Sequence, residues 1–187
     1  IGGTEKKFAQ KMTQEALKLG MTRTRFQNAS GLHHSGQVST ARDMALLTRA
    51  LMLQFPQYYH FFGAKKFKFR DNMIYTHNHF VKTYNGADGL KTGYVDASGF
   101  NLAASAVRHN TRLIGVVFGG RTAKWRDQHM TKLLDHGFTK AREIRIAQAT
   151  STAPKPRRKP RFKGASQQLA LSQPGTNSGM NTPQFNR

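Results

Sequence analysis

Apolar residues recur every three or four positions in three stretches of the chain, a spacing that is typical of amphipathic helices. The pattern predicts helices over residues 5–19, 39–54 and 122–138. Thr4 is placed to cap the first helix and Gly20 to end it, while Ser39 or Thr40 opens the second. Pro56 disfavours helical backbone at the residue before it, so the second helix is expected to stop there. The inward face of the third helix is predicted to carry Met130, Leu133, Leu134 and Phe138.

Alternation with a period of two marks the strands between the second and third helices. In residues 65–70 it predicts a strand with Phe67 and Phe69 pointing inward, and the turn signal Asp71-Asn72 then brings the chain back as a hairpin. Three further strands are predicted over residues 88–94, 99–108 and 113–118. Since these three follow one another directly, they are expected to form an antiparallel meander. The predicted fold class is therefore α+β, an antiparallel sheet with helices packed on it.

The composition changes near residue 145. Residues 145–187 are rich in Pro, Ser, Gln and Asn, and they carry eight Lys or Arg and no acid. Such a segment cannot bury enough apolar surface to offset the entropy lost on ordering it, so we predict a disordered basic tail or linker. Residues 1–144 are predicted to form the folded part.

The whole chain has a formal net charge of +21, which favours anionic partners such as nucleic acid, phospholipid or acidic polymers. It contains no cysteine, which excludes disulfides, thiolate catalysis and thiolate zinc sites. No apolar run approaches the length of about 18 residues that spans a membrane. A metal ion could approach His77-Asn78-His79, but no carboxylate or cysteine set stands beside this pair, so neither a metal nor a cofactor is predicted.

Residues 88–94, DGLKTGY, carry the chemistry that stands out from this background. In one interpretation the segment is an ordinary turn into a strand, Lys91 is solvated and Gly93 marks a bulge. In the other, the strand lies at a sheet edge and pairs with an extended peptide. Gly93 then lets the ligand approach the backbone, Thr92 bonds a carboxylate and Lys91 supplies positive potential.

The surroundings of this motif resemble one family, the serine D-alanyl-D-alanine carboxypeptidases among the low-molecular-mass penicillin-binding proteins. K-T-G is the third motif of penicillin-binding proteins, after S-x-x-K and S-x-N. DGLKTGY is followed by SGFNLAASAVR, RLIGVVFGG and a basic helix, in the order of that family's last strands and final helix. Upstream, LGMTRTRFQNASGL, GQVSTARDMALLTRAL and FPQYYHFF are similar to its helical segments in the same order. The resemblance covers about residues 2–142 and implies a fold like that of penicillin-binding proteins and β-lactamases.

The resemblance implies acyl transfer: a serine attacks the bond between the two terminal D-alanines of a peptidoglycan stem peptide, and water then releases the acyl group. β-Lactam antibiotics would acylate the same serine. Lys91 would orient the substrate, Thr92 would hold its terminal carboxylate, and the backbone after Thr92 would supply an oxyanion-hole N–H. Arg126 falls where the family places an arginine that assists carboxylate recognition, and His77 lies near the family's cleft. The implied substrate-binding residues are Lys91, Thr92, Gly93 and Arg126, and the implied location is the bacterial periplasm, in association with the inner membrane.

The chain departs from the family in one respect. S-x-x-K and S-x-N occur nowhere in the 187 residues, and the nearest sequence, STAR at residues 39–42, ends in an arginine that cannot act as a deprotonated base. The match starts just beyond the family's S-x-N motif, and the first residue is Ile1 rather than Met. We therefore expect residues 1–144 to be the C-terminal portion of a catalytic domain whose N-terminal part is missing, and the chain alone to be inactive.

A second interpretation makes the chain a catalytically inactive basic protein that binds nucleic acid or an anionic surface. Its affinity would fall steeply as salt rises, because binding to a polyanion releases counterions. The basic tail has no periodic aromatic residues on which bases could stack, so no specific nucleic acid is expected as a partner. The tail suits either interpretation, because it also fits an anionic membrane or wall surface.

Overall fold

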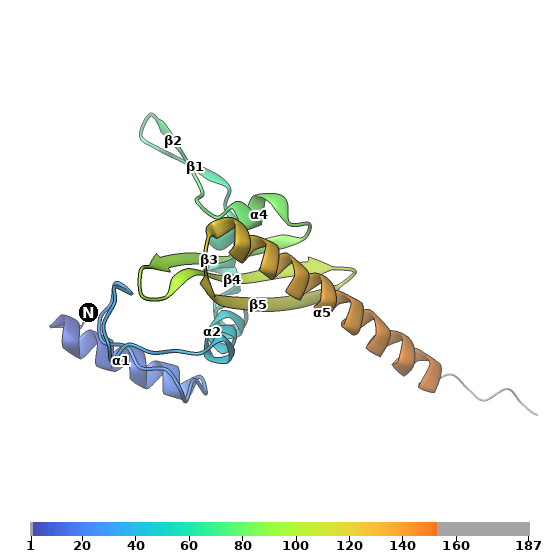
Figure 1. The fold of residues 1–187 in the computed structure, drawn as a ribbon, viewed down its shortest axis with the longest axis horizontal. Helices are drawn as coiled ribbons and strands as arrows, with labels where there is room; N and C mark the ends of the chain where they lie inside the picture. The colour runs from blue at the N-terminus through green and yellow to red at the C-terminus, as the bar shows by residue number, and fades with distance from the viewer. Residues whose placement is uncertain (1, 153–187) are drawn as a thin grey trace, which may run out of the picture. The chain divides into compact units, whose positions relative to one another are not determined.

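Residues 2–152 are described by a computed structural model, with side chains placed up to residue 148. They belong to one compact unit, and residues 153–187, which include most of the predicted tail, lie outside the described part. None of the described helices is long and apolar enough to cross a membrane. In chain order the elements, labelled in Figure 1, are α1 (Glu5–Lys18), α2 (Ala41–Gln54), α3 (Pro56–Tyr59), the 3-10 helix η1 (His60–Gly63), β1 (Lys66–Phe69), β2 (Asn72–Tyr75), α4 (His79–Thr83), β3 (Ala87–Val95), β4 (Gly99–Arg108), β5 (Thr111–Gly120) and α5 (Ala123–Thr152).

The first two long helices begin and end where local chemistry favours it. The Thr4 hydroxyl accepts a hydrogen bond from the Lys7 N–H at 3.3 Å, and the Thr40 hydroxyl accepts one from the Asp43 N–H at 3.1 Å. Gly20, just after α1, has a φ of +83°, which a residue with a Cβ adopts only at a cost. The predicted caps of α1 and α2 are therefore confirmed.

One buried carboxylate fastens the loop after α1 to the start of α2. Asp43 is 3% exposed, and its Oδ2 accepts hydrogen bonds from the Thr24 hydroxyl at 2.7 Å and the Arg23 N–H at 2.9 Å. The hydrogen bond from Thr24 does most to hold the pKa of the Asp43 carboxyl below its usual range. Met21 of the same loop is completely buried. The bonds to Asp43 and the burial of Met21 together hold the loop, and with it α1, beside α2.

The three-stranded sheet is a meander in the order β3-β4-β5, and both of its strand pairs are antiparallel, as predicted. β4 and β5 are joined by a two-residue turn in which His109 and Asn110 have φ of 47° and 59°. Positive φ at both central residues matches the right-handed twist of the strands that such a turn connects. Among the described residues β3 has a strand partner on one side alone, so its other side is a sheet edge.

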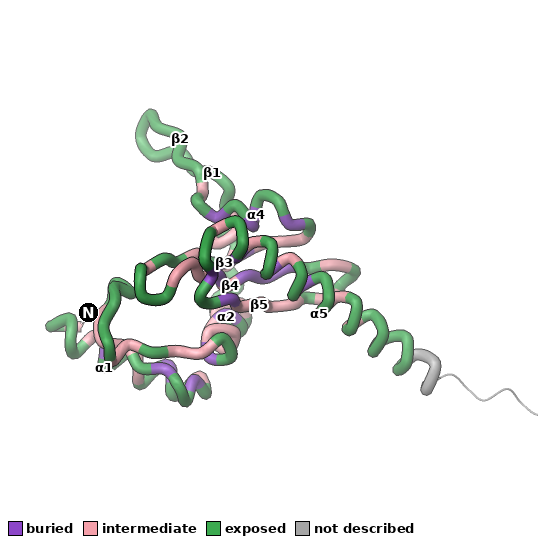
Figure 2. Tube along the Cα trace, in the orientation of Figure 1, coloured by how far each residue is buried: buried purple, intermediate pink, exposed green. Residues whose placement is uncertain are grey.

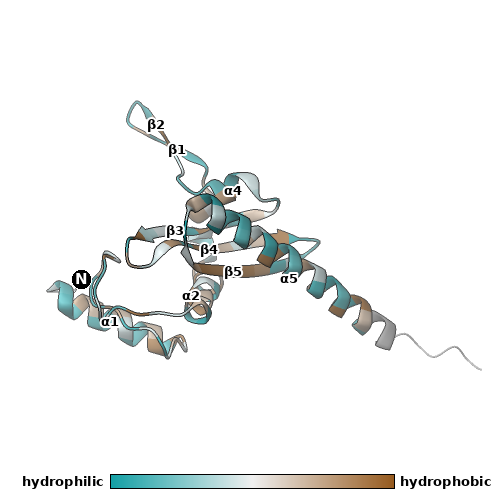
Figure 3. Cartoon of the chain, in the orientation of Figure 1, coloured by the Kyte–Doolittle hydropathy of each residue, from teal (hydrophilic) through white to brown (hydrophobic). Residues whose placement is uncertain are grey.

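Helices lie on both faces of this sheet (Figure 1). On one face, α5 and the α4 segment share a core with β4 and β5 that consists of Phe80, Tyr84, Leu102, Ala104, Ala106, Val117, Met130 and Leu134. On the other face, the Ser105 hydroxyl of β4 is buried and lies 3.8 Å from the Met52 sulfur of α2. Figure 3 shows hydrophobic colouring over much of β5, which like β4 contacts both α5 and α2. The core is therefore built around the central strand, β4.

The β1–β2 hairpin corrects one prediction. Its strands pair in antiparallel register, with Phe67 opposite Ile74, but Phe67 and Phe69 do not point into a core. They are 56% and 55% exposed, and Figure 2 shows that the hairpin is exposed throughout. The reason is that β1 and β2 pack mainly on each other, and Phe67 and Ile74 border a hollow beside β3 instead of packing in a core. The turn between them is Arg70-Asp71, one residue earlier than predicted.

The last helix is longer than its apolar pattern predicts. It continues past Phe138 to Thr152, so the predicted end is wrong and the predicted boundary of the tail falls inside α5. Beyond Phe138 the helix lacks a buried stripe, but charge pairs at helical spacing such as Lys140 with Glu143, 2.9 Å apart, support it. Leu133, predicted to face inward, is 44% exposed, whereas the other three residues of that predicted face are buried or half-buried.

Replacing Asp43 with asparagine is expected to destabilise the fold at neutral pH, because a neutral amide is a weaker acceptor for the Thr24 and Arg23 donors. The pKa of Asp43 is lowered by folding, so its contribution is fully present above the ordinary aspartate pKa of about 3.9 and is lost as pH falls through the folded value. Thermal unfolding of both chains from neutral pH to about pH 3 should show a lower Tm for the variant at neutral pH, and a gap that narrows toward acid. A gap that stays constant over this range would contradict the role assigned to the charge.

Candidate active site

The K-T-G segment begins where β3 becomes an open edge. The first half of the strand is covered by α3 and η1, since Gly89 is buried and a Cβ placed on it would lie 2.6 Å from the Tyr59 hydroxyl. From Lys91 onward the cover ends, and Lys91, Gly93 and Tyr94 are exposed. The backbone of this second half can therefore take an extended ligand as an additional strand.

A polar network fixes the start of β3 just before the motif. Arg112 of β5 forms an ion pair with Asp88, with 2.7 Å between NH1 and Oδ2, and the same guanidinium donates to the Ser105 hydroxyl of β4. The Tyr59 hydroxyl donates to Asp88 Oδ1 at 3.4 Å. Burial raises the pKa of Tyr59, so its phenol stays protonated and remains a donor. The network joins α3 to all three strands of the sheet.

Lys91 and Thr92 lie on opposite faces of β3, because successive strand residues alternate. Thr92 pairs with Leu102, whose side chain is in the α5 core, so Lys91 lies on the α2 side with its partner Ala103. The Lys91 Nζ donates to the Thr92 carbonyl at 2.6 Å. Among the described residues no carboxylate forms an ion pair with Lys91, so its charge is available to an anionic ligand.

One hollow brings together three of the residues singled out in the sequence. It has a volume of about 300 Å³, and His77, Lys91 and Thr92 line it. Its remaining lining includes apolar side chains from η1 and the hairpin, namely Phe61, Phe67 and Ile74. The hollow thus combines the cations Lys66 and Lys91 and the hydroxyl of Thr92 with apolar side chains from η1, the hairpin and β3. Such an arrangement suits a ligand that has a carboxylate at one end and an uncharged body.

Asn78 is a residue of this hollow that the sequence did not single out. It is 6% exposed, and neither its amide nitrogen nor its amide oxygen has a hydrogen-bond partner. A buried amide without partners is costly, which makes this side chain a natural contact for a bound polar group or water. Asn78 is the N-cap residue of α4, yet its side chain makes no capping bond. In the sequence, an asparagine before a short apolar run indicates a helix start. The sequence pattern does not show that the side-chain amide of this asparagine lacks hydrogen-bond partners.

Arg126 lies apart from this hollow. It is 4% exposed, and its Nε and NH2 donate to the Asp127 carboxylate at 2.9 and 2.8 Å. Its NH1 donates to the Asn101 carbonyl at 3.4 Å, and Asn101 is the β4 residue that pairs with Gly93. The guanidinium therefore lies behind the motif at Gly93 rather than beside Lys91, with Asp127 offsetting part of its charge.

The edge continues past the motif as an aromatic surface. Tyr94 follows Gly93, is 55% exposed, and its ring lies 4.4 Å from that of Phe100. Its hydroxyl donates to Asp96 at 2.7 Å, and this hydrogen bond raises the pKa of Tyr94. A protonated phenol and a flat ring are thus held next to the exposed backbone of Gly93.

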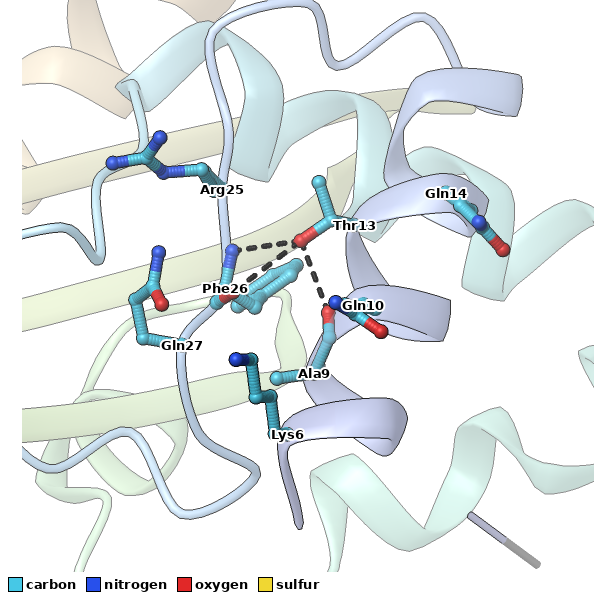
Figure 4. A pocket seen from close by; sticks show the side chains of 8 residues that line it. All are labelled: Lys6, Ala9, Gln10, Thr13, Gln14, Arg25, Phe26 and Gln27. Atoms are coloured by element: carbon cyan, nitrogen blue, oxygen red, sulfur yellow. Dashed lines mark hydrogen bonds between the residues drawn. The ribbon is translucent and has the colours of Figure 1, made fainter. Parts of the chain in front are cut away.

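A second hollow lies between α1 and the loop that follows it, and it contains none of the residues singled out above. Its polar lining consists of Lys6, Gln10, Thr13, Gln14, Arg25 and Gln27. Figure 4 shows the Thr13 hydroxyl at its centre, where it accepts from the Phe26 N–H at 2.9 Å and donates to the Ala9 carbonyl at 3.0 Å. The hydroxyl is occupied in holding the loop on α1, so this hollow offers no nucleophile. Within residues 2–148, no three His, Cys, Asp or Glu side chains gather as metal ligands, and His77 with His79 lacks a third.

Comparison with known sequences relates the chain to one family. The family profile described as D-alanyl-D-alanine carboxypeptidase matches residues 1–122. The chain is 38% identical over 144 residues to D-alanyl-D-alanine carboxypeptidase DacF of Bacillus subtilis, and 41% identical over 139 residues to DacC of Escherichia coli. Each alignment includes 74% of this chain, but the chain spans 37% and 35% of the length of those two relatives.

The chain is also similar to solved structures of penicillin-binding proteins. Penicillin-binding protein 5 of Haemophilus influenzae superposes with a TM-score of 0.68 and 36% identity, over 74% of this chain and 41% of that one. Penicillin-binding protein D2 of Listeria monocytogenes, in its cefotaxime-bound form, superposes with a TM-score of 0.65 and 32% identity, over 70% of this chain and 55% of that one. These likenesses confirm the predicted fold class, α+β and similar to penicillin-binding proteins, for the part of the domain that the chain covers.

Alanine at Gly93 is expected to change the free energy of unfolding by no more than about 0.5 kcal/mol, because a Cβ there meets nothing within 4 Å. Alanine at Gly89 is expected to cost about 1–3 kcal/mol, because its Cβ would lie 2.6 Å from the Tyr59 hydroxyl. Urea unfolding of the two variants measures both values. Similar losses at the two glycines would show that Gly93 is packed, and that β3 has no open edge there.

Proposed function

The chain belongs to the D-alanyl-D-alanine carboxypeptidase family, and on that premise we propose that it forms the K-T-G side of the active site of a serine D,D-carboxypeptidase. The observation that carries the proposal is the open edge of β3, where Lys91 is exposed and forms no ion pair with a described acid. The substrate is a peptidoglycan stem peptide that ends in D-alanyl-D-alanine. Its extended backbone pairs with the edge of β3 from Lys91 onward.

In the reaction that we propose, a serine hydroxyl attacks the carbonyl between the two D-alanines, and an acyl-enzyme ester forms. The proton of the hydroxyl passes to the nitrogen of the leaving D-alanine, and water then cleaves the ester. Lys91 stabilises the negative charge that develops on the attacked carbonyl, and the Thr92 hydroxyl donates to the terminal carboxylate. The absence of a Cβ at Gly93 allows the substrate backbone to come within hydrogen-bonding distance.

We assign the nucleophile to a segment outside these 187 residues. S-x-x-K and S-x-N do not occur in the sequence, and the relatives are longer than the part that this chain matches. These 187 residues alone are accordingly expected to bind the stem peptide without hydrolysing it. In this proposal, residues 1–144 are therefore the C-terminal portion of the catalytic domain.

Arg126 and His77 are proposed to contribute at the two ends of the motif. His77 shares the hollow with Lys91 and Thr92, so it can donate to the carboxylate that Thr92 holds. Arg126 is bonded to Asp127 and to the Asn101 carbonyl, so in this arrangement it acts from behind, by fixing Asn101 opposite Gly93 and adding positive potential. Direct contact of Arg126 with substrate would require it to exchange the Asp127 carboxylate for that of the ligand.

β-Lactams are the proposed inhibitors, because they present a carboxylate and a strained carbonyl to the same groups. The Listeria monocytogenes protein that resembles this chain was solved in cefotaxime-bound and ampicillin-bound forms. We place the protein in the bacterial cell envelope and, more specifically, in the periplasm beside the inner membrane. The basic residues of 145–187 would attract anionic lipid or wall polymer there.

Lys91→Ala, introduced into the native protein that carries this chain, is expected to slow acylation by a fluorescent penicillin by at least about 100-fold. The fold should be unaffected, because the Lys91 side chain is exposed and bonds only to a neighbouring carbonyl. Rates of labelling are read from gels after timed exposure, and the Tm of each variant is measured alongside.

Lys132→Ala is the matched control, since Lys132 is an exposed lysine of α5 and its loss changes the net charge equally. It should label at the original rate. If Lys91→Ala labelled as fast as Lys132→Ala, the role assigned to Lys91 would be wrong.

A further inference from the structure

A large cationic hollow, here called the α5 hollow, lies between the second half of α5 and the turn that joins β4 to β5. Its volume is about 940 Å³, and Figure 1 shows α5 continuing past the sheet beside it. Arg108 lines it from the end of β4, five residues further along the strand than Ala103, the partner of Lys91. Five strand residues extend for roughly 16 Å. None of the residues assigned to the candidate active site lines the α5 hollow, so the two sites are separate.

One arginine of the α5 hollow is fixed and has its charge offset. The NH1 of Arg108 donates to Asp135 Oδ1 at 2.8 Å, and its Nε donates to the Asn85 carbonyl at 3.1 Å. The guanidinium carbon lies 4.4 Å from the centre of the Tyr84 ring and 4.9 Å from that of Phe138. Asp135 is the one acid in the lining of the hollow, and this contact engages it.

Two further arginines line the α5 hollow without an acidic partner. The NH1 of Arg145 donates to the His109 carbonyl at 2.8 Å and to the Thr111 hydroxyl at 3.2 Å. These neutral acceptors hold the guanidinium in place and leave its charge uncompensated. Arg142 lies three residues earlier on α5, at a spacing that places both side chains on one side of the helix, and it forms no ion pair with a described acid. The neighbouring acid, Glu143, does not line the hollow.

We propose that the α5 hollow binds the phosphate group of a phosphate monoester. At neutral pH such a group carries about 1.5 to 2 negative charges and three acceptor oxygens, which matches the uncompensated charges of Arg142 and Arg145. A guanidinium also presents paired N–H donors that fit phosphate oxygens. The Thr111 hydroxyl accepts from Arg145, so its own hydrogen is left to donate to the ligand. A carboxylate has one charge and two oxygens, and it would match only one of these arginines.

The remaining lining indicates what the phosphate is attached to. Phe138 is half-buried and Ile146 is 54% exposed, and both line the α5 hollow. A bare phosphate ion fills only a small part of this volume, so an organic body has room against these two side chains. Covering their apolar surface favours binding. The ligand class is therefore a phosphate monoester with an aromatic or aliphatic body, whether it is free in solution or is the headgroup of a lipid.

Phenyl phosphate is the first probe, titrated calorimetrically into the whole 187-residue chain at about pH 8, where its phosphate is a dianion. Three comparison ligands each change one property: inorganic phosphate lacks the apolar body, phenyl sulfate has a single charge, and benzoate replaces the phosphate by a carboxylate. Phenyl phosphate should bind at least about tenfold more tightly than each of them. Equal binding of phenyl phosphate and benzoate would overturn the proposal.

Substitution of the two uncompensated arginines locates the binding. Arg142→Gln and Arg145→Gln should each weaken the binding of phenyl phosphate by about tenfold. Arg42→Gln is the matched control, because Arg42 is an exposed arginine of α2 that does not line the α5 hollow and its loss changes the net charge equally. It should bind as the original chain does, and so should Lys91→Ala, so a failure here leaves the proposed function untouched.

The Tm and circular dichroism of each variant show whether the fold is kept. If loss of the Arg145 bonds loosens the β4–β5 turn, Arg142→Gln still tests the proposal, because Arg142 forms no ion pair with a described acid. Equal affinities of Arg142→Gln and Arg42→Gln for phenyl phosphate would overturn it.

Vesicles distinguish the two sources of the phosphate monoester. The chains are sedimented with phosphatidylcholine vesicles that contain either phosphatidic acid, a monoester, or phosphatidylglycerol, a diester. If the source is a lipid, Arg142→Gln should lose affinity for the phosphatidic acid vesicles relative to Arg42→Gln, and should lose none for those with phosphatidylglycerol. If the source is soluble, the two variants should sediment equally while their affinities for phenyl phosphate differ. Either result supports the phosphate site and names its source.

Discussion

The burial of β4 between α5 and α2 is the constraint on which the rest of the structure depends. Ala104 and Ala106 have no exposed surface on the α5 side, and Ser105 has none on the α2 side. Small side chains at these positions let both helices approach the strand closely. With its central strand fixed in this way, the sheet can extend on either side of β4, and β3 is placed as an outer strand whose second half is uncovered.

The candidate site depends on this placement of β3 as an outer strand. A polar network of Asp88, Arg112, Ser105 and Tyr59 joins all three strands and α3 just before the K-T-G motif. The cover of α3 and η1 ends there, so a first half of β3 that is covered and bonded leads into an exposed second half. Lys91 and Thr92 are thus held by a supported backbone, and a ligand that pairs with it meets groups already in position.

Local patterns predicted the parts of the fold that local chemistry decides. The caps Thr4 and Thr40, the span of β4 and the order of the meander followed from propensity and spacing, and so did Lys91 and Thr92 as a motif on a strand. The failures lie where packing decides. Alternation in β1 predicted an inward Phe67, but that side chain is 56% exposed because no described element packs over it. The contact of Arg126 with Asp127 is likewise set by packing and is not visible in any motif, and the role predicted for Arg126 stays a prediction. The unpaired amide of Asn78 depends on which atoms surround it, which sequence spacing does not record.

The most direct test of the central claim, that β3 is one wall of a penicillin-reactive site, is fluorescent-penicillin labelling of the native protein. An antibody raised against these 187 residues would capture the protein from its source membranes after labelling. The account predicts a labelled band heavier than the 21.0 kDa of this chain, because it assigns the acylated serine to a segment outside these residues. If the captured protein had the mass of this chain and took up no label, the account would be contradicted. The edge of β3 would then belong to a protein without a penicillin-reactive serine.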